Sequence, residues 1–210
     1  MTEPVALRPS STALLLVEYQ NDFAAEGGSL HTAVSDVMEQ TGMLEHSAAL
    51  VRAARNAGVT IIHAPLAFDP GYEEIAGSAY GILKGVVDSQ SFANDTWGVE
   101  LVDGMTPDPA DVVLTDKRSL DAFSTTNLQF VLESRQINTL AIAGFLTNCC
   151  IESTMRSAYE RGYEVVPVVD CMAATSLEEH EMAVKHNFPR FSRPVDHRQF
   201  LDALPVAVGS

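Results

Sequence analysis

The residues best suited to chemistry are two adjacent cysteines, Cys149 and Cys150, where an apolar run passes into a segment of helical periodicity. Residues 139–143 predict a short buried strand, and residues 153–161 have the spacing of an amphipathic helix. One cysteine therefore stands in the first turn of a helix, at the C-terminal end of a strand. Free backbone N–H groups and the helix dipole favour a thiolate there, and the same groups can hold an oxyanion. The pattern is typical of a cysteine nucleophile, and a buried structural thiol is the alternative for either residue.

Two charged residues follow other predicted strands and could assist such a nucleophile. Glu18 comes directly after the apolar run 13–17, where a carboxylate is either a partly buried general base or a turn cap. Lys117 follows the run 111–114 and is one of only three lysines in the chain. Buried beside the carboxylate and the thiol, its ammonium would orient them and stabilise developing negative charge. The alternative for this lysine is a solvated place in a loop.

Apolar runs alternate with helical segments along most of the chain. Strands are predicted at 13–17, 59–63, 111–114, 139–143 and 163–169, with a short sixth strand from Phe191, and the first helix is predicted over 34–57. Apolar strands separated by helices indicate a parallel sheet covered on both faces. We therefore predict an α/β fold, a three-layer α-β-α sandwich with a six-stranded, mostly parallel sheet. Right-handed crossovers would place the C-terminal ends of the strands along one ligand-binding edge.

The segment 66–109 interrupts this alternation. It is rich in Gly, Asp, Ser and aromatic residues and is long for a connection. We expect a single domain over residues 1–210, in which 66–109 is an irregular insertion that covers the substrate. Aromatic or apolar candidates for the pocket, each with core packing as the alternative, are Phe23, Tyr80, Trp97, Phe123 and Leu146.

The composition limits the classes of partner. A length of 210 residues with 46% hydrophobic content suffices for one sizeable core. The net charge of −15 argues against nucleic acid and membrane partners, and it reflects either solubility or a pocket for a cationic substrate. The first ten residues lack the apolar core of a signal peptide, and three cysteines, two of them adjacent, fit a reducing compartment. We therefore expect a cytoplasmic protein.

Three ordered motifs cover most of the chain outside the insertion. They are Leu15–Phe23 (Leu-Leu-Val-Glu-Tyr-Gln-Asn-Asp-Phe), Lys117–Phe123, and Gly144–Arg156. Together they resemble the isochorismatase-like cysteine hydrolases, a superfamily that includes nicotinamidase, N-carbamoylsarcosine amidohydrolase, ureidoacrylate and biuret hydrolases. The resemblance implies hydrolysis of an amide-type carbon–nitrogen bond (amide, lactam, ureido or carbamoyl) in a small molecule. One branch opens the lactam of the polycation streptothricin, which the acidic composition would suit.

The resemblance implies a catalytic triad of Glu18, Lys117 and Cys150, and it selects Cys150 as the nucleophile of the pair. It also implies a cis peptide bond between Phe145 and Leu146, and an oxyanion hole made by the N–H groups of Leu146 and Cys150. The family's carboxylate is normally aspartate. The extra methylene of Glu18 moves the carboxylate by about 1.5 Å, so either the pocket is rebuilt around it or activity is impaired. The other intact motif residues favour a rebuilt, active site.

The metal cluster of the nicotinamidases has no full counterpart in this sequence. The region after the second predicted strand offers only His63 and Asp69, too few ligands for a closed site, so we expect no metal and no cofactor. The family resemblance suggests a homodimer or homotetramer. Two other functions stay open: a vinyl-ether hydrolase of the isochorismatase type, which does not need the cysteine, and a non-catalytic binding protein, for which Glu18 is the main argument.

Overall fold

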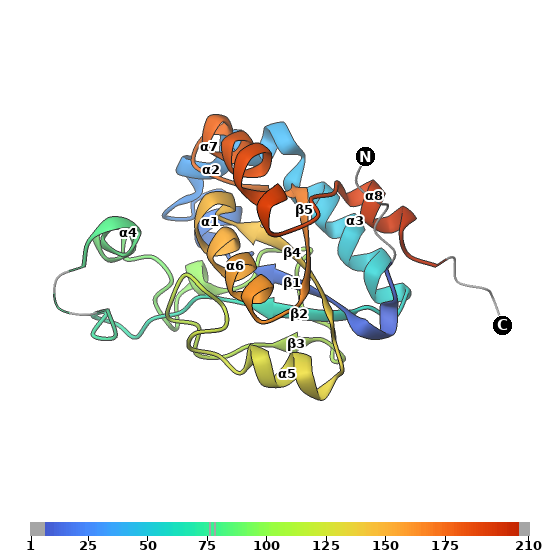
Figure 1. Ribbon diagram of the computed structural model, residues 1–210. Helices are drawn as coiled ribbons and strands as arrows, with labels where there is room; N and C mark the ends of the chain where they lie inside the picture. The colour runs from blue at the N-terminus through green and yellow to red at the C-terminus, as the bar shows by residue number, and fades with distance from the viewer. Residues whose placement is uncertain (1–6, 76, 78, 206–210) are drawn as a thin grey trace.

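The computed structural model describes residues 7–75, 77 and 79–205 (Figure 1). A parallel five-stranded sheet with the strand order β3-β2-β1-β4-β5 forms its centre. The strands are β1 (Thr12–Val17), β2 (Thr60–Ala64), β3 (Val112–Val113), β4 (Thr139–Phe145) and β5 (Glu164–Ala173). The predicted α/β fold with a parallel sheet is confirmed.

Eight α-helices lie in the described ranges. They are α1 (Asn21–Ala24), α2 (His31–Thr41), α3 (Met43–Asn56), α4 (Gly81–Ser89), α5 (Leu128–Ser134), α6 (Glu152–Glu160), α7 (Leu177–Met182) and α8 (His197–Asp202). Short 3₁₀ turns cover Pro9–Ser11, Trp97–Val99 and Phe188–Arg190, and π-helical turns cover Thr147–Ile151 and Ala183–Asn187. None of the helices in this part of the chain is long and apolar enough to span a membrane.

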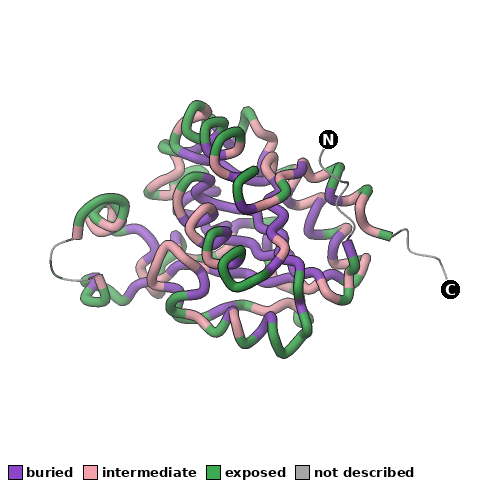
Figure 2. Tube along the Cα trace, in the orientation of Figure 1, coloured by how far each residue is buried: buried purple, intermediate pink, exposed green. Residues whose placement is uncertain are grey.

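Side chains of β1 alternate between two helical layers. Leu14 and Leu16 pack in a cluster with residues of α2, α3 and α8, whereas Leu15 and Val17 pack with residues of α5 and α6. Because successive side chains of a strand point to opposite faces, an apolar strand such as β1 is buried on both. The sheet therefore lies between two layers of helices (Figure 1), and the buried residues concentrate along its strands (Figure 2).

The prediction of a six-stranded sheet is wrong. Phe191, expected to begin the sixth strand, follows a 3₁₀ turn and packs in the core. Further along, Val195 forms only one isolated parallel bridge, with Val168 of β5. The N–H group of Arg193 bonds to the carbonyl oxygen of Val165, but Pro167 of β5 has no N–H group to donate back to Arg193. On the other side Asp196 caps α8, so the pairing does not extend in either direction.

The single helix predicted over 34–57 is two helices that meet at Gly42. This glycine has a φ of +65°, and its N–H group bonds to the carbonyl oxygens of Met38 and Glu39 at the end of α2. A glycine in the left-handed region is a common helix end, because it carries no Cβ to clash. Helical periodicity on both sides of Gly42 concealed this boundary.

The segment 66–109 is less irregular than expected, because it contains α4. Ile82, Leu83, Val86 and Val87 have helical spacing within a stretch whose composition otherwise favours loops. In Figure 1, α4 extends out from the body of the molecule at the left of the view. The segment therefore brings an apolar helix, as well as loops, to one side of the sheet.

Gly144 permits a close approach of β1 and β4 next to the predicted site. Its φ is +127°, and a Cβ atom there would lie 2.0 Å from the carbonyl oxygen of Val17.

We expect Gly144→Ala to lower the free energy of unfolding by about 3 kcal/mol, the sum of left-handed strain and overlap with backbone. Gly58→Ala is the control, because Gly58 also has a positive φ but nothing lies within 4 Å. Urea unfolding should show that Gly58→Ala lowers the free energy of unfolding by only about 1 kcal/mol. Equal losses in the two variants would contradict this account.

Candidate active site

The three residues predicted to be catalytic come from three neighbouring parts of the sheet edge. Glu18 directly follows β1, and Cys150 lies in the turn after the adjacent β4. Lys117 follows β3, and its backbone forms a parallel bridge with Leu66, which comes just after β2. Glu18 and Cys150 line the same cavity. The C-terminal ends of parallel strands thus bring these groups together, as the topology of the sheet requires.

Glu18 and Lys117 form a fully buried ion pair. The Lys117 ammonium donates a hydrogen bond to Glu18 Oε1 and a second one, of 2.7 Å, to the carbonyl oxygen of Ser119. The two residues are 1% and 0% exposed. Burial alone would lower the pKa of Lys117, but the negative charge of Glu18 and the hydrogen bond to it outweigh burial and raise the pKa. Lys117 is therefore a permanent cation at the site. The Glu18 carboxylate, although one methylene longer than the aspartate usual in the family, accepts a hydrogen bond from the Lys117 ammonium.

Backbone strain lies beside both members of this pair. Glu18 has a φ of +58°, and Asp116, directly before Lys117, has a φ of +64°. For residues other than glycine this conformation costs about 1–2 kcal/mol each. The Glu18 turn is held by hydrogen bonds from its N–H group to Ala64 O (3.2 Å) and from Gln20 N–H to its carbonyl oxygen (2.7 Å). The strained turn ends β1 at the residue whose side chain the site uses.

The two adjacent cysteines lie in the π-helical turn Thr147–Ile151, which leads into α6. The carbonyl oxygen of Leu146 opens this turn by accepting from the N–H groups of Ile151, at 3.2 Å, and Cys149, at 3.0 Å. The peptide bond between Phe145 and Leu146 is cis, as the family resemblance implies. Cys149 is partly buried, whereas Cys150 is buried and lines the cavity. The turn therefore presents Cys150, and not Cys149, to the cavity.

The surroundings of Cys150 keep its thiol protonated at rest. A hydrogen bond with Cys149, burial and the Glu18 carboxylate all raise the pKa of Cys150 well above its usual value, and Lys117 alone works in the opposite direction. The helix-dipole argument from sequence favoured a thiolate, because it did not include these neighbours. The arrangement suits attack by the thiol as its proton passes to a nearby base.

Thr154 connects the nucleophile turn to the lysine motif, a link that the sequence reading missed. Its buried hydroxyl donates to the carbonyl oxygen of Cys150 at 2.7 Å and accepts from the N–H group of Ala122 at 3.0 Å. In the same turn, the Thr147 hydroxyl is 2.9 Å from Nδ1 of His180 in α7. These contacts fix the turn that carries Cys150 against its neighbours on two sides.

Polar residues of the first-strand motif hold the 66–109 segment over the site. The Gln20 side chain bonds to both the N–H group and the carbonyl oxygen of Leu66, at 2.8 and 2.7 Å, and to Val99 O at 2.8 Å. The Asp22 carboxylate accepts from the N–H group of Phe92 at 2.6 Å. Sequence reasoning used these residues as part of the motif and missed their role. The available signal was a polar run directly after a buried strand.

The cavity beside Cys150 has a volume of about 150 Å³ and an almost wholly apolar lining. The apolar side chains come from α1, α2, α4 and the connections that follow the strands. Leu66 is one of them, so the Gln20 hydrogen bonds to its backbone hold part of the cavity wall in place.

Of the predicted pocket residues, the structure brings Phe23 and Leu146 to the cavity. Tyr80 and Trp97 are 87% and 52% exposed and do not line it, and Phe123 packs in the layer of α5 and α6. Aliphatic side chains of α2 and α4 take the places expected for aromatic ones. Which side of a helix or loop faces Cys150 depends on tertiary packing, which local composition does not show.

The two residues weighed as metal ligands do not meet in the structure. His63 is buried in β2, with Nε2 3.3 Å from the carboxylate of Asp111. Asp69 instead accepts a hydrogen bond of 2.8 Å from the side chain of Asn94. Each has its own polar partner, so together they do not form a pair of ligands for one ion.

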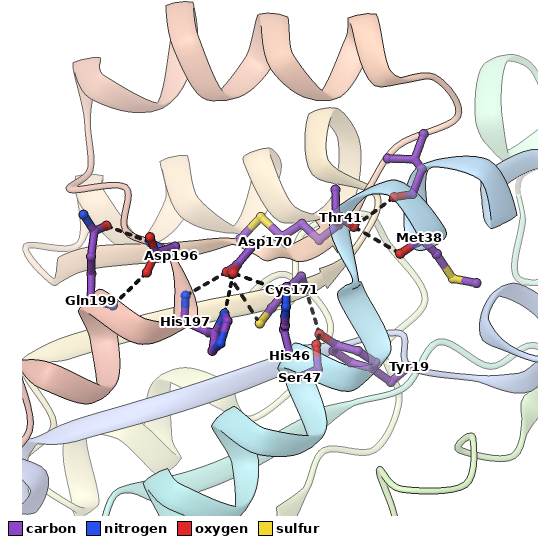
Figure 3. Close-up of polar contacts among 12 residues, drawn as sticks. Tyr19, Met38, Thr41, His46, Ser47, Asp170, Cys171, Asp196, His197 and Gln199 are labelled. Atoms are coloured by element: carbon purple, nitrogen blue, oxygen red, sulfur yellow. Dashed lines mark hydrogen bonds and ion pairs between the residues drawn. The ribbon is translucent and has the colours of Figure 1, made fainter.

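A second polar cluster lies between α3, β5 and α8 (Figure 3). The carboxylate of Asp170 contacts Nδ1 of His197, accepts the His197 N–H group at 2.7 Å, and lies 3.3 Å from Nδ1 of His46. One ligand atom from each residue lies within 4.8 Å of the others. The imidazole rings, however, stack with centroids 4.1 Å apart and planes at 21°. Lone pairs in nearly parallel ring planes do not converge on one ion, so we interpret the cluster as a junction that docks α8 on α3 and β5.

The geometry of the site can now be compared with known proteins. Residues 12–199 match the isochorismatase domain, a range that contains all three sequence motifs. The chain belongs to the isochorismatase family. The resemblance predicted from the motifs is therefore confirmed.

Two relatives named ureidoacrylate amidohydrolase are similar to this chain over most of their length. The chain is 35% identical over 179 residues to ureidoacrylate amidohydrolase RutB of Methylorubrum extorquens, an alignment that covers 80% of this chain and 72% of the relative. It is 33% identical over 221 residues to ureidoacrylate amidohydrolase RutB of Cronobacter turicensis, covering 99% of this chain and 95% of the relative. The similarity to both proteins therefore extends well beyond the site motifs.

Solved structures share the fold of this isochorismatase-family chain. A cysteine hydrolase from Pseudomonas syringae superposes with a TM-score of 0.80 at 24% identity, covering 97% of this chain and 98% of the other. An isochorismatase family protein from Desulfovibrio vulgaris superposes with a TM-score of 0.79 at 25% identity, covering 92% and 98%. The fold of this chain is therefore shared with both proteins.

Proposed function

We propose that this protein is a cysteine hydrolase that cleaves an amide-type carbon–nitrogen bond of a small molecule through a thioester intermediate. The observation that carries the proposal is the buried Glu18–Lys117 ion pair, whose carboxylate shares a cavity with the thiol of Cys150. A general base, a nucleophile and a fixed cation at one cavity are the parts that acyl transfer needs. Relatives named as amidohydrolases, 35% identical to this chain, support the carbon–nitrogen class.

The reaction begins when the substrate carbonyl lies against Cys150. Glu18 takes the thiol proton while the sulfur attacks the carbonyl carbon, and the N–H groups of Leu146 and Cys150 stabilise the oxyanion. Glu18 then gives its proton to the leaving nitrogen as the carbon–nitrogen bond breaks, which leaves a thioester. Glu18 next takes a proton from water, whose oxygen attacks the thioester, and the acid leaves with the thiol restored. Lys117 holds the Glu18 carboxylate in place through both steps.

We expect Glu18→Gln to lower kcat/KM by about 10³-fold, because an amide cannot accept or return the proton. Glu18→Asp should be milder, about 10²-fold, because its carboxylate retreats from both the thiol and the ammonium. The kcat/KM of both variants is measured by the release of ammonia or amine from a panel of small amides, ureides and lactams. Glu160→Gln makes the same change at an exposed position and should have no effect. Hydrolysis by Glu18→Gln at the unaltered rate would reject Glu18 as the base.

We also propose that the enzyme acts in the cytoplasm as a homodimer or homotetramer. The exposed aromatic side chains of Tyr80 and Trp97, both in the 66–109 segment, support contact with a second copy of the chain. Light scattering of the purified protein measures the mass of the assembly directly. A monomer at micromolar concentration would reject this part of the proposal.

A further inference from the structure

The cavity beside Cys150 has walls that are apolar except at Glu18 and Thr175. They are formed by aliphatic or aromatic side chains, among them Phe23, Leu30, Leu66, Leu83, Val86 and Phe92. Thr175 is the one hydroxyl residue of the lining, and its hydroxyl donates to the Glu179 carboxylate. Beyond the reacting groups of Glu18 and Cys150, the described lining therefore offers a substrate no free side-chain hydrogen-bond donor.

The positively charged side chains of Lys117 and Arg118 already have partners within the protein. No Lys, Arg or His is found among its described lining residues. Lys117 is 0% exposed, and its ammonium bonds to Glu18 and to the Ser119 carbonyl oxygen. Arg118, next along the chain, has Nε 3.3 Å from the Glu74 carboxylate. A charged substituent bound here would have no partner of opposite charge, because the only carboxylate in the lining already neutralises Lys117.

The dimensions set the size of the group that fits. A cavity of about 150 Å³ with mostly Leu, Ile and Phe walls is the size that accepts one benzene molecule. Entry of a carboxylate or ammonium would require loss of its hydration shell with no compensating contact. A hydrocarbon group loses no hydrogen bonds and gains the whole apolar contact.

We propose that the substrate is an uncharged amide or ureide whose substituent is a hydrocarbon group no larger than a benzene ring. This inference rests on the proposed function and narrows it. It separates the chain from relatives named for ureidoacrylate, which carries a carboxylate, and from the polycationic substrate that the acidic composition allowed. Net charge lies on the surface of the molecule, whereas specificity is set by the lining of the cavity.

Three chloroacetamides of similar length test the proposal without requiring turnover. They are N-butyl-2-chloroacetamide, its anionic analogue N-(2-carboxyethyl)-2-chloroacetamide, and its cationic analogue N-(3-aminopropyl)-2-chloroacetamide. Mass spectrometry of the intact enzyme gives the rate at which each modifies Cys150, and each rate is divided by that for glutathione. We expect the neutral probe to modify Cys150 at least about 10-fold faster than either charged one.

The outcomes separate this inference from the proposed function. An anionic or cationic probe that matches or exceeds the neutral one overturns the inference and leaves the cysteine hydrolase standing. If no probe modifies Cys150 faster than it modifies glutathione, the nucleophile is not activated, and both proposals fall. Hydrolysis of pentanamide, succinamate and 4-aminobutanamide should follow the same order of preference.

A variant tests whether the wall itself sets this preference. Leu83→Arg places a cation on the α4 wall and should raise the ratio of anionic to neutral labelling at least about 10-fold. Val113→Arg is the matched control, because Val113 is 46% exposed on β3 and outside the cavity lining. An unchanged ratio in the folded Leu83→Arg protein would overturn the assignment of this wall.

Discussion

Cys150→Ala is expected to abolish amide hydrolysis, lowering kcat by at least about 10⁴-fold, because no other group in the cavity can form the thioester. Loss of a small, buried sulfur leaves only a small void, so the thermal unfolding profile should stay close to that of the unaltered protein. Steady-state kinetics on the best substrate of the amide panel measures the effect, and circular dichroism verifies the fold.

Cys149→Ala is the matched control for this prediction. Cys149 is the same residue type one position earlier and does not line the cavity, so most activity should remain. Its hydrogen bond helps to raise the pKa of Cys150, and its removal should therefore move the alkylation profile of Cys150 to lower pH. Full amide hydrolysis by Cys150→Ala would reject the thioester route. The vinyl-ether alternative would instead be favoured if the unaltered protein and Cys150→Ala were both inactive on the amide panel and equally active on a vinyl ether.

Lys117→Met is expected to lower the free energy of unfolding by about 3–5 kcal/mol, because it leaves the Glu18 carboxylate buried without its cation. Activity should fall as well, since Lys117 would no longer hold the Glu18 carboxylate in place. The double variant with Glu18→Gln removes both charges and should recover part of the lost stability. Urea unfolding of the single and double variants measures this coupling. Additive losses would mean that the ion pair does not hold the two side chains together.

The raised pKa of Lys117 also predicts how the stability difference between the unaltered protein and Lys117→Met depends on pH. A cation with a raised pKa in the folded state stabilises the fold fully below its unfolded pKa, about 10.4, and loses this contribution as pH rises through the folded pKa. The stability difference between the unaltered protein and Lys117→Met should therefore stay level from pH 7 to about pH 10 and shrink above it. A decline already near neutral pH would contradict the assigned charge state.

Short stretches of the sequence determine the positions of the strands, the type of sheet and the family of this protein. The apolar runs before Glu18 and Cys150 predict strands that the structure contains, and their lack of alternation correctly indicates a sheet buried on both faces. The C-terminal ends of parallel strands share one edge, so strand positions alone predicted that these side chains would meet. The motifs also identified the family. These properties depend on residue order over a few positions, which is what a sequence shows directly.

Other properties were decided only by tertiary structure. The expected sixth strand is reduced to a single bridge because Pro167 of β5 cannot donate to it, and the expected long first helix ends at Gly42. Local signals did not decide either point. The cavity lining and the pKa of Cys150 depend on groups far apart in the chain, as with the ion pair of Glu18 and Lys117, 99 positions apart. Burial and charge interactions depend on distances in space, and those distances exist only once the chain has folded.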